Sequence, residues 1–131
     1  MLSIRKQTPS RGLDLVESPR PTIQSHEALI KIKKTAICGT DVHIYNWDTW
    51  AQQHLSLPRI IGHECVGEIK ELGTAIQGLT QGDIVSVEGH LFCGECQQCK
   101  QKKYHLCEVG KGVGMDVDGA FCEYMKVHFM K

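Results

Sequence analysis

Apolar and polar positions alternate over several short segments of the chain. Within residues 28–37, isoleucines alternate with lysines, a pattern that predicts a strand with one buried face. Residues 60–72 and 84–87 are two further segments rich in β-branched side chains, with Gly62 and Gly67 as expected bends. We therefore expect strands to dominate the secondary structure.

Turns and helices are predicted at fewer places. Three prolines keep residues 6–24 out of helix, and Asp118-Gly119 predicts a hairpin turn. Thr40 is expected to N-cap a short helix that extends through Tyr45, and residues 98–106 are expected to turn helically. Many short strands with frequent glycine predict an all-β, barrel-like domain.

Length and charge narrow the class of protein. The chain has 131 residues with 15 basic and 15 acidic side chains, which suits one domain with one modest core. The balanced charge argues against nucleic acid or an anionic membrane as a partner, and no apolar stretch approaches membrane-spanning length. The first residues lack the apolar core of a signal peptide, so we expect a soluble protein of the reducing cytoplasm.

Four of the seven cysteines lie close together in the sequence, with the spacing C-x2-C-x2-C-x7-C: Cys93, Cys96, Cys99 and Cys107. The short spacings let three sulfurs converge and the longer arm brings the fourth, which suits a closed tetrahedral Zn2+ site. Disulfides, an iron–sulfur cluster and unrelated buried thiols are the alternatives. A reducing compartment disfavours disulfides, and an iron–sulfur cluster takes a different spacing. We expect a structural zinc here.

A second group of metal-ligand types lies at Cys38 and at Gly62-His63-Glu64. A thiol, an imidazole and a carboxylate suit a catalytic zinc, which takes three protein ligands and keeps one position open. Each residue alone has a simpler explanation, as a core thiol or a hydrogen-bonding side chain. Because consecutive strand residues point to opposite faces, His63 and Glu64 need a kink to reach one ion. Glu64 either binds the ion directly or orients a residue that does.

Taken together, the two groups resemble one known family. Gly62-His63-Glu64, with Gly67 and Gly73 after it, resembles the signature of zinc-dependent medium-chain alcohol dehydrogenases, and the cysteine quartet resembles their structural-zinc lobe. Residues 35–48 and Glu88-Gly89-His90 narrow the resemblance to the members that oxidise L-threonine.

The resemblance implies a domain organisation and a reaction. Residues 1–131 are expected to form a GroES-like catalytic domain, a mainly β fold with a partly open β-barrel, short helices and a zinc lobe at about residues 89–112. The implied reaction converts L-threonine to L-2-amino-3-oxobutanoate with NAD+. The NAD-binding Rossmann domain is expected outside these residues, so the isolated chain is expected to be inactive, and the full-length protein is expected to be a homotetramer.

The resemblance also assigns roles to single residues. It implies two zinc ions per chain, one on the cysteine quartet and one on Cys38 and His63, with Glu64 in one of the two roles above. Thr40 and His43 resemble the family's proton relay from the catalytic zinc site to water. The chemistry is sensible because a hydroxyl both accepts and donates protons and histidine titrates near neutral pH. Three positions apart, the two side chains share one side of a helix.

Two other functions stay open at this point. Another polyol or secondary alcohol is an alternative substrate within the same family. A zinc-stabilised binding module without catalysis is an alternative from a different class. Such a module would need only the metal held by the quartet, so two zinc ions per chain would favour the enzyme.

Overall fold

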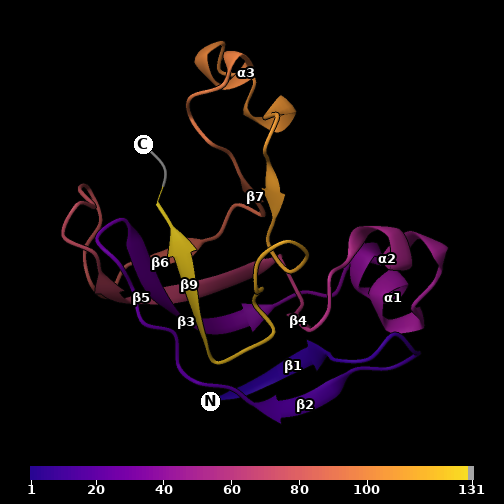
Figure 1. The fold of residues 1–131 in the computed structure, drawn as a ribbon. Coiled ribbons are helices and arrows are strands. Elements are labelled where there is room, and N and C mark those ends of the chain that lie inside the picture. The colour runs from indigo at the N-terminus through magenta and orange to yellow at the C-terminus, as the bar shows by residue number, and fades with distance from the viewer. Residues whose placement is uncertain (130–131) are drawn as a thin grey trace.

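The computed structural model describes residues 1–129, which form a mainly β fold with short helices (Figure 1). The strands are β1 (Leu2–Lys6), β2 (Asp14–Glu17), β3 (Glu27–Thr35), β4 (Arg59–Ile60), β5 (Cys65–Leu72), β6 (Ile84–Ser86), β7 (His90–Leu91), β8 (Lys111–Gly112) and β9 (Tyr124–His128). The helices are α1 (Gly39–Asn46), α2 (Thr49–His54), α3 (Gln97–Lys100) and the 3-10 turn η1 (Tyr104–Leu106).

The described strands form open sheets that do not close into a barrel. One sheet has the order β2-β1-β4, a second has the order β6-β5-β3-β9, and β7 pairs with β8 by itself. All of these pairings are antiparallel. The prediction of a mainly β fold with short helices is therefore confirmed, and the open sheets fit the partly open form that was expected.

The pairing of β3 with β5 is the longest in the fold and decides which loops meet. Thr35 at the end of β3 lies opposite Cys65 at the start of β5. The segment that follows β3 and the segment that precedes β5 therefore leave the sheet side by side. Two further bonds hold them together, because Ala36 N–H and Thr35 Oγ1 both donate to the carbonyl of Glu64, each at 2.9 Å.

Helices α1 and α2 lie beside the β2-β1-β4 sheet (Figure 1) and bury their apolar side chains in one core cluster. Its buried members are Ile44, Ala51, Leu55, Ile61 and Phe121. The cluster joins both helices to the segment that leads into β5, so it fixes the helices relative to that segment.

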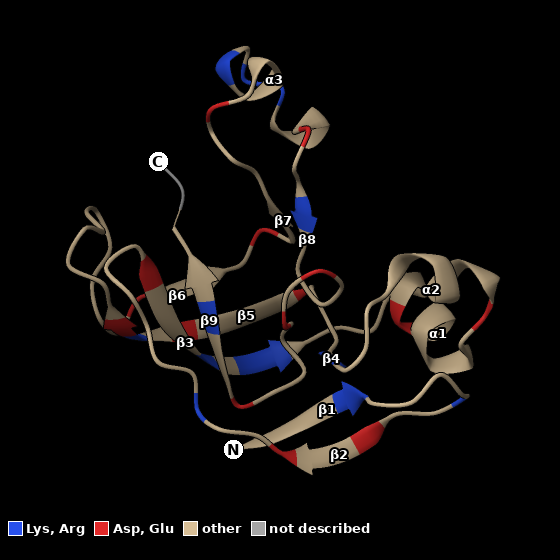
Figure 2. Cartoon of the chain, in the orientation of Figure 1, with Lys and Arg blue, Asp and Glu red and all other residues tan. Residues whose placement is uncertain are grey.

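A narrow lobe projects from the sheets and carries α3 and η1 at its far end (Figure 1). Strands β7 and β8 pair at its base, with His90 opposite Gly112. Helical turns within residues 98–106 are as predicted. Basic residues near α3 are visible in Figure 2, which otherwise shows acidic and basic residues spread over both large sheets. Within residues 1–129, no helix has the length and apolar character needed to cross a membrane.

Three local predictions are wrong. Asp118 and Gly119 form no hairpin, because this segment instead hydrogen-bonds along β4, with Gly119 N–H donating to the Ile60 carbonyl at 2.8 Å. Thr40 lies inside α1, whose N-cap is Cys38. Gly67 lies within β5 and is no bend; a Cβ there would come within 2.3 Å of the Ile30 side chain, so close packing explains this glycine.

Candidate metal centres

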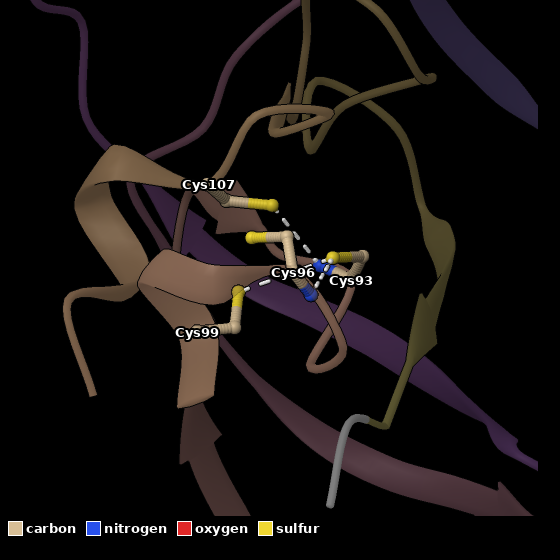
Figure 3. Close-up of side chains that lie close together, drawn as sticks. All are labelled: Cys93, Cys96, Cys99 and Cys107. Carbon is tan, nitrogen blue, oxygen red and sulfur yellow. Dashed lines mark hydrogen bonds between the residues drawn. The ribbon is translucent and has the colours of Figure 1, made fainter. Parts of the chain in front are cut away.

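The four cysteines of the lobe converge on one point (Figure 3). One sulfur from each of Cys93, Cys96, Cys99 and Cys107 lies within 4.8 Å of the other three. Two sulfurs bound to one tetrahedral zinc at about 2.3 Å each are about 3.8 Å apart. The Cys93 and Cys99 sulfurs, 4.0 Å apart, therefore stand close to that separation.

Backbone amides surround these sulfurs and favour the thiolate form. The N–H groups of Cys93 and Cys96 donate to Cys107 Sγ and Cys93 Sγ respectively, each at 3.3 Å. Hydrogen bonds from backbone N–H groups, first that of Glu108, lower the pKa of the Cys96 thiol to about 6. Burial has the opposite effect on Cys99 and raises the pKa of its thiol to about 12. A cation next to Cys99 would offset the cost of ionising a buried thiol, so the donor set fits Zn2+.

The lobe has almost no apolar core of its own. Between Phe92 and Gly110, Cys99 is the only buried residue. The one aromatic contact in this region stacks Phe92 on Tyr104, with ring centroids 4.3 Å apart. Without enough buried apolar surface, a segment of this kind takes its folding free energy from the metal. The four thiols leave no open position, so the centre is suited to a structural role.

A second group of ligand atoms meets where the loops after β3 and before β5 leave the sheet. Cys38 Sγ lies 3.3 Å from His63 Nε2. The sulfur, the imidazole nitrogen and a Glu64 carboxylate oxygen all lie within 4.8 Å of one another. A tetrahedral zinc holds a sulfur and a nitrogen ligand about 3.6 Å apart. The structure therefore brings together all three residues that the sequence suggested, including Glu64.

Gly62 gives the chain the kink that this geometry needs. Its φ of +88° lies in the left-handed region, and His63 and Glu64 follow it in irregular backbone between β4 and β5. Regular alternation is interrupted here, so both side chains can point to the same place. A Cβ at position 62 would lie 2.2 Å from the Phe121 ring, so the site also needs glycine for space.

Asp41 adds a negative charge beside this second group. The residue is buried, with 4% exposed, and its Oδ2 accepts a hydrogen bond from the Cys38 backbone N–H at 3.0 Å. Its Oδ1 is buried without a hydrogen-bond partner among the described residues. An unpaired buried carboxylate oxygen is costly, and a cation on Cys38 would offset part of that cost. The residues thus fit a bound Zn2+ here.

The two residues of the expected relay lie on α1. Thr40 is half-buried in the first turn and His43 is exposed in the last turn. The sequence reasoning missed one partner of this pair, since His43 Nδ1–H donates to the Asp48 carboxylate. It also missed Trp50, whose ring centroid lies 5.5 Å from that of His43. Neither has a recognisable sequence signal, because both contacts depend on how α2 turns back on α1.

Fold and sites together define the class of the protein as a mainly β domain with one cluster of four thiols and one mixed cluster of a thiol, an imidazole and a carboxylate, both with the side chains of metal sites. Residues 24–130 match the family described as Alcohol dehydrogenase GroES-like domain. The chain belongs to this family, the zinc-dependent medium-chain alcohol dehydrogenases.

Named relatives point to one group within the family. The chain is 47% identical over 127 residues to L-threonine 3-dehydrogenase of Shewanella woodyi, covering 97% of this chain. It is 49% identical over 125 residues to the enzyme of that name from Shewanella frigidimarina, covering 95% of this chain. In both cases the match spans only 37% of the relative's own length.

Solved structures of related dehydrogenases share the fold. The alcohol dehydrogenase TADH from Thermus sp. ATN1 superposes with a TM-score of 0.86 at 32% identity, covering 98% of this chain and 38% of its own. Galactitol-1-phosphate dehydrogenase from Escherichia coli superposes with a TM-score of 0.89 at 29% identity, covering 98% and 36%. The fold therefore occurs with more than one alcohol substrate, and substrate identity needs a separate argument.

Proposed function

We propose that this chain is the catalytic-domain portion of a zinc- and NAD-dependent L-threonine 3-dehydrogenase. The full-length enzyme oxidises the 3-hydroxyl of L-threonine and gives L-2-amino-3-oxobutanoate and NADH. The observation that carries the proposal is the meeting of Cys38, His63 and Glu64 in one open cluster, in a chain whose relatives at 46–49% identity bear that enzyme name.

The two clusters divide the work between structure and chemistry. The quartet presents four thiols and has no place for a substrate. The second cluster presents a thiol, an imidazole and one exposed carboxylate, the ligand count of a catalytic zinc that keeps one position for substrate. We therefore assign one zinc ion to each cluster. A zinc at the second cluster would lower the pKa of a substrate hydroxyl so that its proton leaves near neutral pH.

Cys38 and His63 are the residues we assign to hold the catalytic ion. The Asp41 carboxylate orients the Cys38 backbone from behind, and the bonds from Thr35 and Ala36 to the Glu64 carbonyl hold the two ligand segments together. Glu64 is the exposed member of the cluster, whereas Cys38 and His63 are half-buried. We assign it as a ligand, because its carboxylate already lies within reach of the other two ligand atoms.

Thr40 and His43 are the residues we assign to move the substrate's proton to water. The Thr40 hydroxyl accepts a proton from the substrate side and donates its own onward. His43 receives it and, being exposed, releases it to solvent. The nicotinamide cofactor accepts the hydride, and we assign its binding to the part of the protein outside these residues, since the relatives are longer than this chain.

Substrate profiling of the full-length protein tests the assignment. Initial rates of NADH formation are measured with L-threonine, sorbitol and 2,3-butanediol at matched concentrations. We expect the largest kcat/KM with L-threonine. A larger kcat/KM with either of the other alcohols would refute the threonine assignment and favour another dehydrogenase of the same family. A protein that binds one zinc ion per chain and oxidises none of these alcohols would favour a zinc-stabilised binding module.

A further inference from the structure

The turn between α1 and α2 joins a histidine, a carboxylate and an indole. Asp48 is the N-cap of α2, and its Oδ1 accepts a hydrogen bond from the Ala51 backbone N–H at 3.1 Å. Its other oxygen, Oδ2, accepts a hydrogen bond from His43 Nδ1–H. Trp50 packs its ring against the same imidazole at an angle of 47°. His43 is thus held from two directions.

The backbone of the turn is arranged to bring these side chains together. Trp47 ends α1 in the left-handed conformation, with a φ of +54°, and its N–H donates to the carbonyls of His43 and Ile44. A non-glycine residue in this region costs about 1–3 kcal/mol and persists only where its surroundings hold it. Lys6 supplies part of that hold. It is 1% exposed, its Nζ donates to the Gly12 carbonyl at 2.9 Å, and it lies 5.2 Å from the centre of the Trp47 ring.

The hydrogen bond between His43 and Asp48 determines which nitrogen of His43 carries the proton. An ionised carboxylate only accepts hydrogen bonds, so Nδ1 must be the protonated nitrogen. We propose that Asp48 is a positioning residue that holds neutral His43 as its Nδ1–H tautomer and leaves the Nε2 lone pair free to accept a proton. The inference rests on the relay role given to His43 above and names the residue that prepares it.

Proton balance follows directly from this arrangement. The arriving proton bonds to Nε2 and gives an imidazolium that carries protons on both nitrogens, with the Asp48 carboxylate beside it. Loss of the Nε2 proton to water regenerates the starting tautomer. The His43 hydrogen bond, and after it the Ala51 N–H, hold the pKa of Asp48 below its ordinary value, so Asp48 is ionised throughout. Asp48 itself neither donates nor accepts a proton during the transfer.

Water can reach both partners of the hydrogen bond between His43 and Asp48. The side chains of His43 and Asp48 are 54% and 39% exposed. The other titratable group near this stack, His54, packs on Trp50 with ring centroids 4.8 Å apart, and its Nδ1 lies 2.7 Å from the Trp50 carbonyl oxygen. It therefore does not replace Asp48 as the partner of Nδ1.

The test is imidazole 15N spectroscopy of the zinc-loaded chain at a pH where His43 is neutral. Two variants keep the cap of α2, because serine and asparagine also accept the Ala51 N–H. Asp48→Ser removes the carboxylate from His43. Asp48→Asn uses its one oxygen for the cap and so turns its NH2 group toward Nδ1, which can then only accept. We expect mainly Nδ1–H in the wild type and mainly Nε2–H in both variants.

A tautomer ratio in Asp48→Ser equal to that of the wild type would overturn the inference, because Asp48 would then be only a cap. Steady-state kinetics of the full-length enzyme give a second readout. Asp48→Ser should lower kcat about ten-fold with little change in KM, a smaller loss than the about 100-fold or more expected when a general acid or base is itself removed. The same substitution should have no further effect in a His43→Asn background. If the variants change the tautomer of His43 but the wild-type enzyme does not oxidise threonine, the proposed function is refuted and the positioning role is still supported.

Discussion

Replacing Gly62 with alanine adds one methyl group at the kink that precedes His63. The new Cβ would stand 2.2 Å from Phe121 Cδ1, and the ring is buried in the core cluster, so it has little room to move. A left-handed φ costs an L-residue about 1–2 kcal/mol. Alanine also lowers the conformational entropy of the unfolded chain, which offsets about 0.4–1 kcal/mol of that cost. Overpacking adds about 1–3 kcal/mol. We therefore expect a loss of about 2–4 kcal/mol in the free energy of unfolding.

Gly78 offers a matched control for the backbone term. Its φ of +80° is close to that of Gly62, but a Cβ there would have no atom within 4 Å. Gly78→Ala should therefore cost only about 1 kcal/mol. Urea denaturation of both variants with zinc present, followed by tryptophan fluorescence, measures the difference. Equal losses in the two variants would show that the contact with Phe121 does not constrain position 62, and the reasoning would be refuted.

Three further predictions concern the metal, the charges and the cofactor. Cys93→Ser should lower the melting temperature of the zinc-loaded chain far more than His43→Asn, because only the first removes a ligand of the lobe; similar melting temperatures in a thermal scan would contradict this. The pKa of Glu68 is lowered from 4.5 to about 2 by Lys33 and then Lys70, so its contribution to stability is present above pH 4.5 and is lost as the pH falls toward 2. Glu68→Gln should therefore reduce the urea midpoint slightly at pH 6 and less at pH 3, and a gap that widens at pH 3 would refute the sign. The isolated chain should produce no NADH from L-threonine in an absorbance assay, and measurable production would show that these residues bind the cofactor.

The cysteine quartet could be predicted from the sequence because its geometry is local. The four residues lie within one short lobe, and their spacing alone limits how they can meet. The second cluster could not be derived in this way. Cys38 and His63 are 25 positions apart and meet only because β3 pairs with β5. Single residues carried no sign of that pairing, so the suggestion depended on resemblance to a family.

Two of the wrong predictions show how contacts override the preference of a single residue. Asp118 and Gly119 have the local preference for a hairpin, but the segment hydrogen-bonds along β4 and Gly119 packs against the Gly62 backbone. Thr40 is a good N-cap residue, but Asp41 bonds the Cys38 N–H and starts the helix two residues earlier. The Gly119 contact joins residues far apart in the sequence, whereas Asp41 acts on Cys38 over three positions and Asp48 on His43 over five.

Zinc titration of the chain tests the central claim, that it holds one closed and one open zinc site. Isothermal titration calorimetry of the metal-free chain should show two zinc ions bound per chain. The same titration of Cys38→Ser should show one, bound by the quartet. A wild-type chain that binds a single zinc ion, or a Cys38→Ser variant that still binds two, would contradict the open site at Cys38 and His63.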